Sequence, residues 1–98
     1  MNKDEILELL ASHQDEMAEF GIKSLSIFGS VARDEAVIES DIDLLVEFDP
    51  EIHIGLFAFA RLRRRLSELL GKEVDLVTPD AIRPEMREEI FRESVRAA

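Results

Sequence analysis

The stretch that decides the fold runs from Ile27 to Phe48 and reads IFGSVARDEAVIESDIDLLVEF. It contains the end of an apolar strand, a Gly29-Ser30 turn, a polar link of nine residues, and a second apolar strand with two carboxylates near its start. Residues two apart in a strand point to the same face of the sheet. Asp41 and Asp43 are therefore expected to project side by side.

Two carboxylates held together repel each other, and this raises the pKa of one of them unless a cation lies between them. Hard oxygen ligands of this kind suit Mg²⁺, which typically takes one or two carboxylates together with substrate phosphates. Gly29 allows backbone N–H groups to approach a phosphate closely, and the Ser30 hydroxyl adds a donor. The stretch therefore predicts a site for a metal ion and a nucleotide.

Two further residues lie close to this predicted site in the sequence. Arg33 can pair with a phosphate in a bidentate manner, or it can form a surface salt bridge with Asp34 or Glu35, and the spacing alone favours neither. Ser40 is expected to support the turn before the second strand by hydrogen-bonding to the backbone. We include both residues among the candidate nucleotide-binding residues.

The remainder of the chain predicts helices and a third strand. Hydrophobic spacing predicts helices over residues 3–20, 56–70 and 84 to about 96, and strands over residues 22–28, 41–48 and 73–78. Asp75 is a single carboxylate inside the third strand, where an unpaired charge is unusual. The chain is thus predicted to be a small α/β (α+β) domain, residues 1–98, in which helices cover a mixed sheet of about three strands.

The net charge of −10 is unevenly distributed. Residues 1–50 carry 3 basic and 13 acidic side chains, whereas residues 51–98 carry 9 of each. Direct nucleic-acid binding by the acidic half is disfavoured, because phosphate backbones need neutralisation by Lys and Arg. A basic protein partner would fit this half more easily, although charge of this kind also serves solubility.

The chain contains no cysteine, which excludes a disulfide framework, a thiolate metal site and a cysteine nucleophile. Its start, Met1-Asn2-Lys3-Asp4-Glu5, is charged and is not followed by a long apolar run. From these features we expect no signal peptide and no membrane span, and hence a cytoplasmic protein.

The motif resembles that of the nucleotidyltransferase superfamily, which includes DNA polymerase beta and kanamycin nucleotidyltransferase. It is most similar to the minimal nucleotidyltransferases, the MntA-type antitoxins encoded beside HEPN-domain toxins. Their pattern, Gly-Ser-x-Ala-Arg-Gly followed by Ser-Asp-x-Asp-Leu, appears here as GSVARD and SDIDL, and LLGKEVDLVT matches the strand with the third carboxylate, Asp75. The resemblance covers nearly the whole chain. One residue departs from it: Asp34 stands where the family usually has glycine.

The resemblance implies a role for each candidate residue. Two Mg²⁺ ions would be held by Asp41 and Asp43, with Asp75 completing the second metal site and helping to deprotonate the acceptor hydroxyl. The β- and γ-phosphates of ATP would be bound by Gly29, Ser30 and Arg33. Asp34 would bring negative charge near those phosphates, although aspartate tolerates the left-handed backbone better than most residues.

The resemblance also implies a reaction, in which AMP is transferred from ATP to a hydroxyl on a partner protein. That partner would be a HEPN-type ribonuclease toxin, adenylylated on a tyrosine by its antitoxin. Two alternatives remain from the sequence. The chain could be a non-catalytic antitoxin that neutralises its partner by binding, which Asp34 favours, or a small-molecule nucleotidyltransferase that acts as an oligomer.

Overall fold

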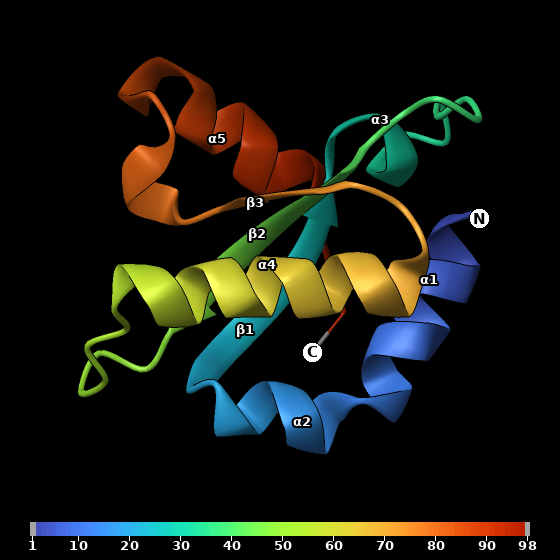
Figure 1. Cartoon of the computed structure of the whole chain (residues 1–98). Coiled ribbons are helices and arrows are strands. Elements are labelled where there is room, and N and C mark those ends of the chain that lie inside the picture. Colours follow the sequence, from blue (N-terminus) through green and yellow to red (C-terminus); the bar gives the residue numbers. More distant parts are fainter. Residues whose placement is uncertain (1, 98) are drawn as a thin grey trace.

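The computed structural model describes residues 2–97, in which strands are interspersed with helices (Figure 1). Among these residues no helix is both long and apolar enough to cross a lipid bilayer. The elements are α1 (Lys3–Ser12), α2 (Gln14–Glu19), β1 (Ile22–Phe28), α3 (Gly29–Ala32), β2 (Ile42–Phe48), α4 (Leu56–Leu70), β3 (Val74–Val77), the 3₁₀ helix η1 (Pro79–Ala81), α5 (Pro84–Glu93) and β4 (Val95–Arg96).

The strands form one mixed sheet in the order β3-β2-β1-β4. β1 pairs antiparallel with both β2 and β4, whereas β2 and β3 run parallel and are joined by the crossover helix α4. The predicted α/β class is confirmed, and the described sheet has one strand more than the three that the sequence predicted.

The additional strand, β4, comes from residues that were predicted to continue the last helix. α5 ends at Glu93, Ser94 adopts an extended backbone (φ −67°, ψ 144°), and Val95 pairs with Ile27 of β1. The outer edge of β1 would otherwise present unpaired backbone groups, and a β-branched residue such as Val95 suits a strand. Pairing with this edge therefore outweighs one further turn of helix.

The prediction of one helix over residues 3–20 was also wrong, because the helix breaks at His13. The His13 backbone N–H donates to the carbonyl of Leu10, three residues back, at 3.1 Å. The Leu9 carbonyl accepts instead from the Ser12 hydroxyl at 2.7 Å and lies 2.9 Å from His13 Nδ1. Side-chain hydrogen bonds of this kind compete with the helical backbone pattern.

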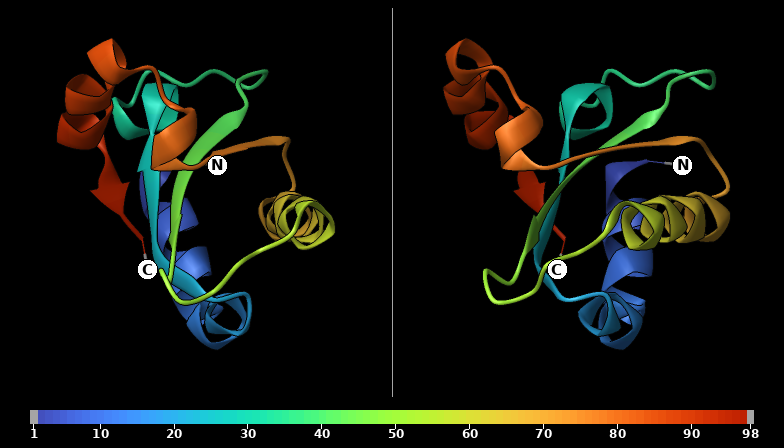
Figure 2. Two further views of the ribbon diagram at one scale, coloured as in Figure 1. Left: turned by 90° about the vertical axis from the view of Figure 1, so that its left-hand side faces the viewer. Right: turned by 60° about the vertical axis from the view of Figure 1, so that its left-hand side comes forward.

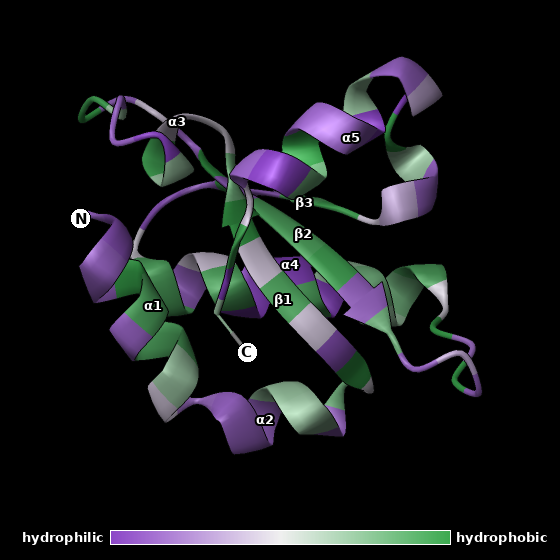
Figure 3. Ribbon diagram, turned by 180° about the vertical axis from the view of Figure 1, so that it is seen from behind, coloured by the Kyte–Doolittle hydropathy of each residue, from purple (hydrophilic) through white to green (hydrophobic). Residues whose placement is uncertain are grey.

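The two faces of the sheet are covered unequally. α1, α2 and α4 lie on one side of it and α5 lies on the other (Figure 2). Most of the core packs between the sheet and the first group, and no side chain of α5 is fully buried. In Figure 3 the ribbon of β2 is mostly hydrophobic, whereas that of α5 is largely hydrophilic. The buried core cluster consists of Ile6, Leu10, Met17, Leu25, Ile27, Val31, Ile42, Leu44, Val46, Leu62, Leu66, Leu70, Val74 and Leu76.

Candidate active site

The three candidate carboxylates lie at one end of the sheet. Asp43 in β2 and Asp75 in β3 are direct partners in the parallel register, so their side chains leave the same face of adjacent strands. Asp41 lies two residues before Asp43, just outside β2, and is exposed. Ile42 and Leu44 point into the core, as the predicted alternation requires.

The electrostatics of this cluster are dominated by unbalanced negative charge. Burial raises the pKa of Asp43, and the neighbouring carboxylates of Asp75 and Asp41 raise this pKa further. Glu93 acts in the same direction, and only the positive charge of Arg33 opposes the increase in the pKa. The ionised form of Asp43 is therefore electrostatically unfavourable in the folded chain, and a bound cation would stabilise it.

Gly29 makes room for the Asp43 carboxylate. Phe28 pairs with Asp43 across β1 and β2, so Gly29, the next residue, lies against the Asp43 side chain. A Cβ at this position would overlap the Asp43 Oδ2 atom, and the φ of +74° is in the left-handed region. Both observations require glycine at the turn that follows β1.

Glu93, at the end of α5, contacts two of the predicted nucleotide-binding residues. The Gly29 backbone N–H donates to Glu93 Oε1 at 3.1 Å, and Arg33 Nη1 donates to Glu93 Oε2 at 3.0 Å. Arg33 Nε also donates to Glu35 at 3.1 Å, so the local salt bridge that the spacing allowed is formed. Sequence reasoning missed Glu93, because no local pattern connects it to a turn more than sixty residues earlier.

Ser30 and Ser40 occupy the two ends of the link between β1 and β2. The Ser30 carbonyl accepts from the backbone N–H of Glu35 at 2.8 Å. Ser40 Oγ accepts from the backbone N–H of Val37 at 3.0 Å, which confirms the predicted support of the turn.

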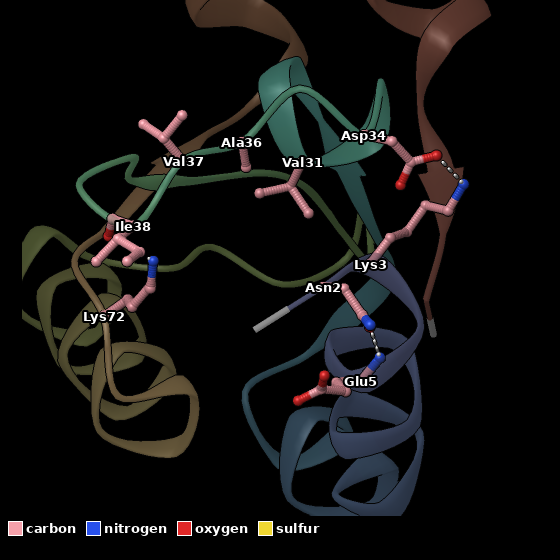
Figure 4. Close-up of a pocket in the computed structure, with 9 residues that line it drawn as sticks. All are labelled: Asn2, Lys3, Glu5, Val31, Asp34, Ala36, Val37, Ile38 and Lys72. Atoms are coloured by element: carbon pink, nitrogen blue, oxygen red, sulfur yellow. Dashed lines mark hydrogen bonds and ion pairs between the residues drawn. The ribbon is translucent and has the colours of Figure 1, made fainter.

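Asp34 adopts a left-handed backbone with φ 58°, as expected for a residue at a glycine position of the motif. Its carboxylate lies 3.6 Å from Lys3 Nζ of α1, and its side chain is 70% exposed. The charge of Asp34 is thus directed at Lys3, as Figure 4 shows.

The donor set of the cluster fits a divalent cation. Asp41, Asp43 and Asp75 offer only hard oxygen ligands, and the raised pKa of Asp43 reflects a lack of positive charge among them. Within residues 2–97, however, no three Asp, Glu, His or Cys side chains converge closely enough to enclose an ion. A cation would therefore have to draw these side chains together, with substrate phosphates completing its coordination.

A surface cavity of about 470 Å³ lies between the start of α1, the α3–β2 link and the α4–β3 link (Figure 4). Its lining includes Lys3, Val31, Asp34, Ile38 and Lys72, and Lys72 Nζ donates to the Ile38 carbonyl at 2.7 Å. None of the three aspartates lines it. The carboxylate cluster therefore faces the surface outside this cavity.

The sequence and the fold of the chain are similar to those of known proteins. The family model described as a nucleotidyltransferase domain matches residues 6–97. The protein adenylyltransferase MntA of Thermococcus cleftensis is 39% identical over 93 residues, which cover 94% of this chain and 92% of the relative. A solved structure titled as that of a "putative minimal nucleotidyltransferase" is 36% identical, with a TM-score of 0.81 over 97% of this chain and 95% of that one.

A more distant solved structure shares the fold. It contains a tri-AMPylated HEPN toxin of Shewanella oneidensis in complex with its MNT antitoxin. The match has a TM-score of 0.64 at 17% identity, and it covers 94% of this chain and 71% of that chain.

Proposed function

Because the chain belongs to the nucleotidyltransferase domain family and is a nucleotidyltransferase, we propose that it transfers AMP from ATP to a hydroxyl group of a partner protein. The observation that carries this proposal is the pairing of Asp43 with Asp75 beside the Gly29 turn. This arrangement sets carboxylates, which can hold metal ions, next to backbone and guanidinium donors, which can hold phosphates.

The relatives support a protein as the acceptor. The Thermococcus cleftensis relative is named a protein adenylyltransferase, and the Shewanella oneidensis complex contains an AMPylated HEPN toxin. We therefore propose that the chain, residues 1–98 as one catalytic domain, is a cytoplasmic antitoxin and that its substrate is a tyrosine of a HEPN-type ribonuclease toxin.

In the proposed reaction the acceptor oxygen forms a bond to the α-phosphorus of ATP. The bond from that phosphorus to the oxygen bridging to the β-phosphate breaks, and pyrophosphate leaves. Asp75 takes the proton of the acceptor hydroxyl. Asp41 and Asp43 would hold two Mg²⁺ ions, with Asp75 completing the second metal site, and the bound ions would stabilise charge on the entering and leaving oxygens. Gly29, Ser30 and Arg33 would donate hydrogen bonds to the β- and γ-phosphates.

The exposure of the cluster favours a large acceptor over a small one. Asp41 and Asp75 are exposed, and the nearby cavity does not include them. A hydroxyl presented by another macromolecule can reach two exposed carboxylates directly, whereas a small acceptor is usually held in an enclosing pocket.

Intact-mass spectrometry of a co-purified partner tests the proposal. After incubation with Mg²⁺ and ATP, we expect the partner to gain the mass of one or more adenylate groups, and the Asp43→Asn enzyme should add none. An unmodified partner that still binds tightly would indicate an antitoxin that acts by binding alone. An adenylated small molecule with an unmodified partner would indicate a small-molecule transferase.

Asp34→Gly, which restores the residue usual in the family, is expected to strengthen ATP binding severalfold with little change in stability. Glycine removes about 1 kcal/mol of left-handed strain but makes the unfolded chain more flexible, and the exposed ion pair with Lys3 contributes at most about 1 kcal/mol. Calorimetric titration with ATP and a thermal melt measure the two effects.

Asp34→Asn separates the charge of Asp34 from its backbone strain. Asparagine also tolerates the left-handed region, so this variant removes only the charge. It should strengthen ATP binding as much as Asp34→Gly does if the charge is responsible. Unchanged affinity in both variants would show that the ion pair with Lys3 already keeps the charge away from the phosphates.

A further inference from the structure

The carboxylate of Glu93 uses both of its oxygens on the turn that follows β1. Oε1 accepts from the Gly29 backbone N–H and Oε2 accepts from Arg33 Nη1, at 3.1 and 3.0 Å. The side chain of Glu93 is only 19% exposed, whereas that of Arg33 is 45% exposed. Glu93 is thus a partly buried carboxylate directed at the proposed phosphate-binding residues.

The stability of α5 does not explain a carboxylate at this position. Glu93 is the last residue of α5, where the helix dipole disfavours negative charge. Arg92, the residue before it, provides the favourable charge and pairs with Glu88 at 3.0 Å. The contacts with Gly29 and Arg33 are therefore what Glu93 contributes to the structure.

These contacts resemble the ones that a phosphate would make. A carboxylate and a phosphate both accept charge-assisted hydrogen bonds from guanidinium and backbone N–H groups, and both can be bound by one arginine. The Gly29 N–H has one hydrogen to donate, and the Arg33 Nε already donates to Glu35. A phosphate oxygen that approaches Gly29 and Arg33 must compete with Glu93 for them.

We propose that Glu93 is an internal competitor for the nucleotide phosphates, which occupies Gly29 and Arg33 until ATP displaces it. This inference rests on the proposed nucleotidyl transfer. The pairing of Val95 with Ile27 holds the end of α5 beside Gly29, so the displacement moves the Glu93 side chain and not the helix. Glu93 occupies only the residues proposed to bind the β- and γ-phosphates, so the competition acts on ATP and not on a nucleotide without these phosphates.

The test is a calorimetric titration of the purified chain with ATP and, separately, with AMP, both in the presence of Mg²⁺. Glu93→Gln removes the charge and keeps the shape of the side chain, and Glu93→Ala removes the competitor entirely. Glu89→Gln is the matched control, because it removes the same charge from an exposed position on the same helix. Thermal melts establish that each variant is folded.

Glu93→Gln is expected to bind ATP about tenfold more tightly than the parent, which corresponds to a parent site that is open about one-tenth of the time. AMP binding should not change, and Glu89→Gln should leave ATP binding as it is. ATP binding that is unchanged or weaker in both folded Glu93 variants, in a parent that does bind ATP, overturns the competition alone. If Glu89→Gln strengthens ATP binding by the same factor, the competition is overturned too, because a general loss of negative charge then explains the tighter binding. If neither the parent nor any variant binds ATP, the proposed function fails together with this inference.

Discussion

Asp43→Asn is expected to reduce the rate of nucleotidyl transfer about a thousandfold or more. Bound metal ions stabilise the transition state by several kcal/mol, and this stabilisation depends on the Asp43 carboxylate as a ligand. The same substitution should leave the metal-free fold at least as stable as the parent. Asp43 is partly buried beside Asp75 and Asp41, so the neutral amide avoids a cost that the ionised carboxylate bears at neutral pH. The gain should stay below about 1 kcal/mol, because solvent screens a half-exposed group.

The sign of the pH dependence follows from the raised pKa of Asp43. The folded protein holds the Asp43 proton more tightly than the unfolded chain does. The resulting stabilisation is complete below the ordinary pKa of an aspartate and is lost as the pH rises through the raised value. Thermal melts of the parent should therefore show this loss as the pH rises through that window, and Asp43→Asn should not show it.

Glu47→Gln is the matched control for Asp43→Asn, because it removes a carboxylate from the same strand at the far end from the cluster. It should keep full transfer activity. Transfer by Asp43→Asn within tenfold of the parent would exclude Asp43 as a metal ligand. A large loss of stability in Asp43→Asn would show that the carboxylate is held by favourable contacts and not by the constraints of the strand.

The carboxylate cluster could be predicted from the sequence because alternation in a strand is a local rule. Asp43 and Asp75 each interrupt an apolar run, and each is followed by residues that must face the core. Once Leu44 and Leu76 are placed in the core, their preceding carboxylates are fixed on the opposite face. The parallel register that makes the two residues partners then follows from pairing the buried sides of β2 and β3.

Two of the missing parts of the prediction, β4 and the contacts of Glu93, depend on contacts between distant segments. The residues of β4 have no strand pattern long enough to be recognised, and they become a strand because β1 offers a free edge. In the sequence, Glu93 resembles the other exposed carboxylates of an acidic helix. The pairing of β4 with β1 places the end of α5 beside Gly29, and this brings Glu93 into contact with that residue. From the sequence, only Asp34 and Glu35 could be proposed as ion-pair partners of Arg33. The ion pair between Arg33 and Glu93 forms only when the chain folds.

Gly29→Ala is expected to destabilise the protein by about 2–3 kcal/mol and to lower transfer at least about a hundredfold. The left-handed backbone alone costs an alanine about 1–2 kcal/mol. The added Cβ also overlaps Asp43 Oδ2, so either the turn or the carboxylate must shift, and a displaced catalytic group commonly loses about this much rate. The melting temperature should fall by about 8–24 °C, at about 4–8 °C per kcal/mol for a domain of this size.

Gly71→Ala separates the two causes within the same molecule. Gly71 follows α4 with a φ of +67°, close to that of Gly29, but a Cβ there meets no atom within 4 Å. This variant should bear only the backbone cost of about 1–2 kcal/mol and should keep its transfer activity. The difference between the two variants then measures the contact between Gly29 and Asp43. If both lose the same stability and both remain active, Asp43 rotates away from the added methyl group without harm, and close packing of the turn against this carboxylate is not required for transfer.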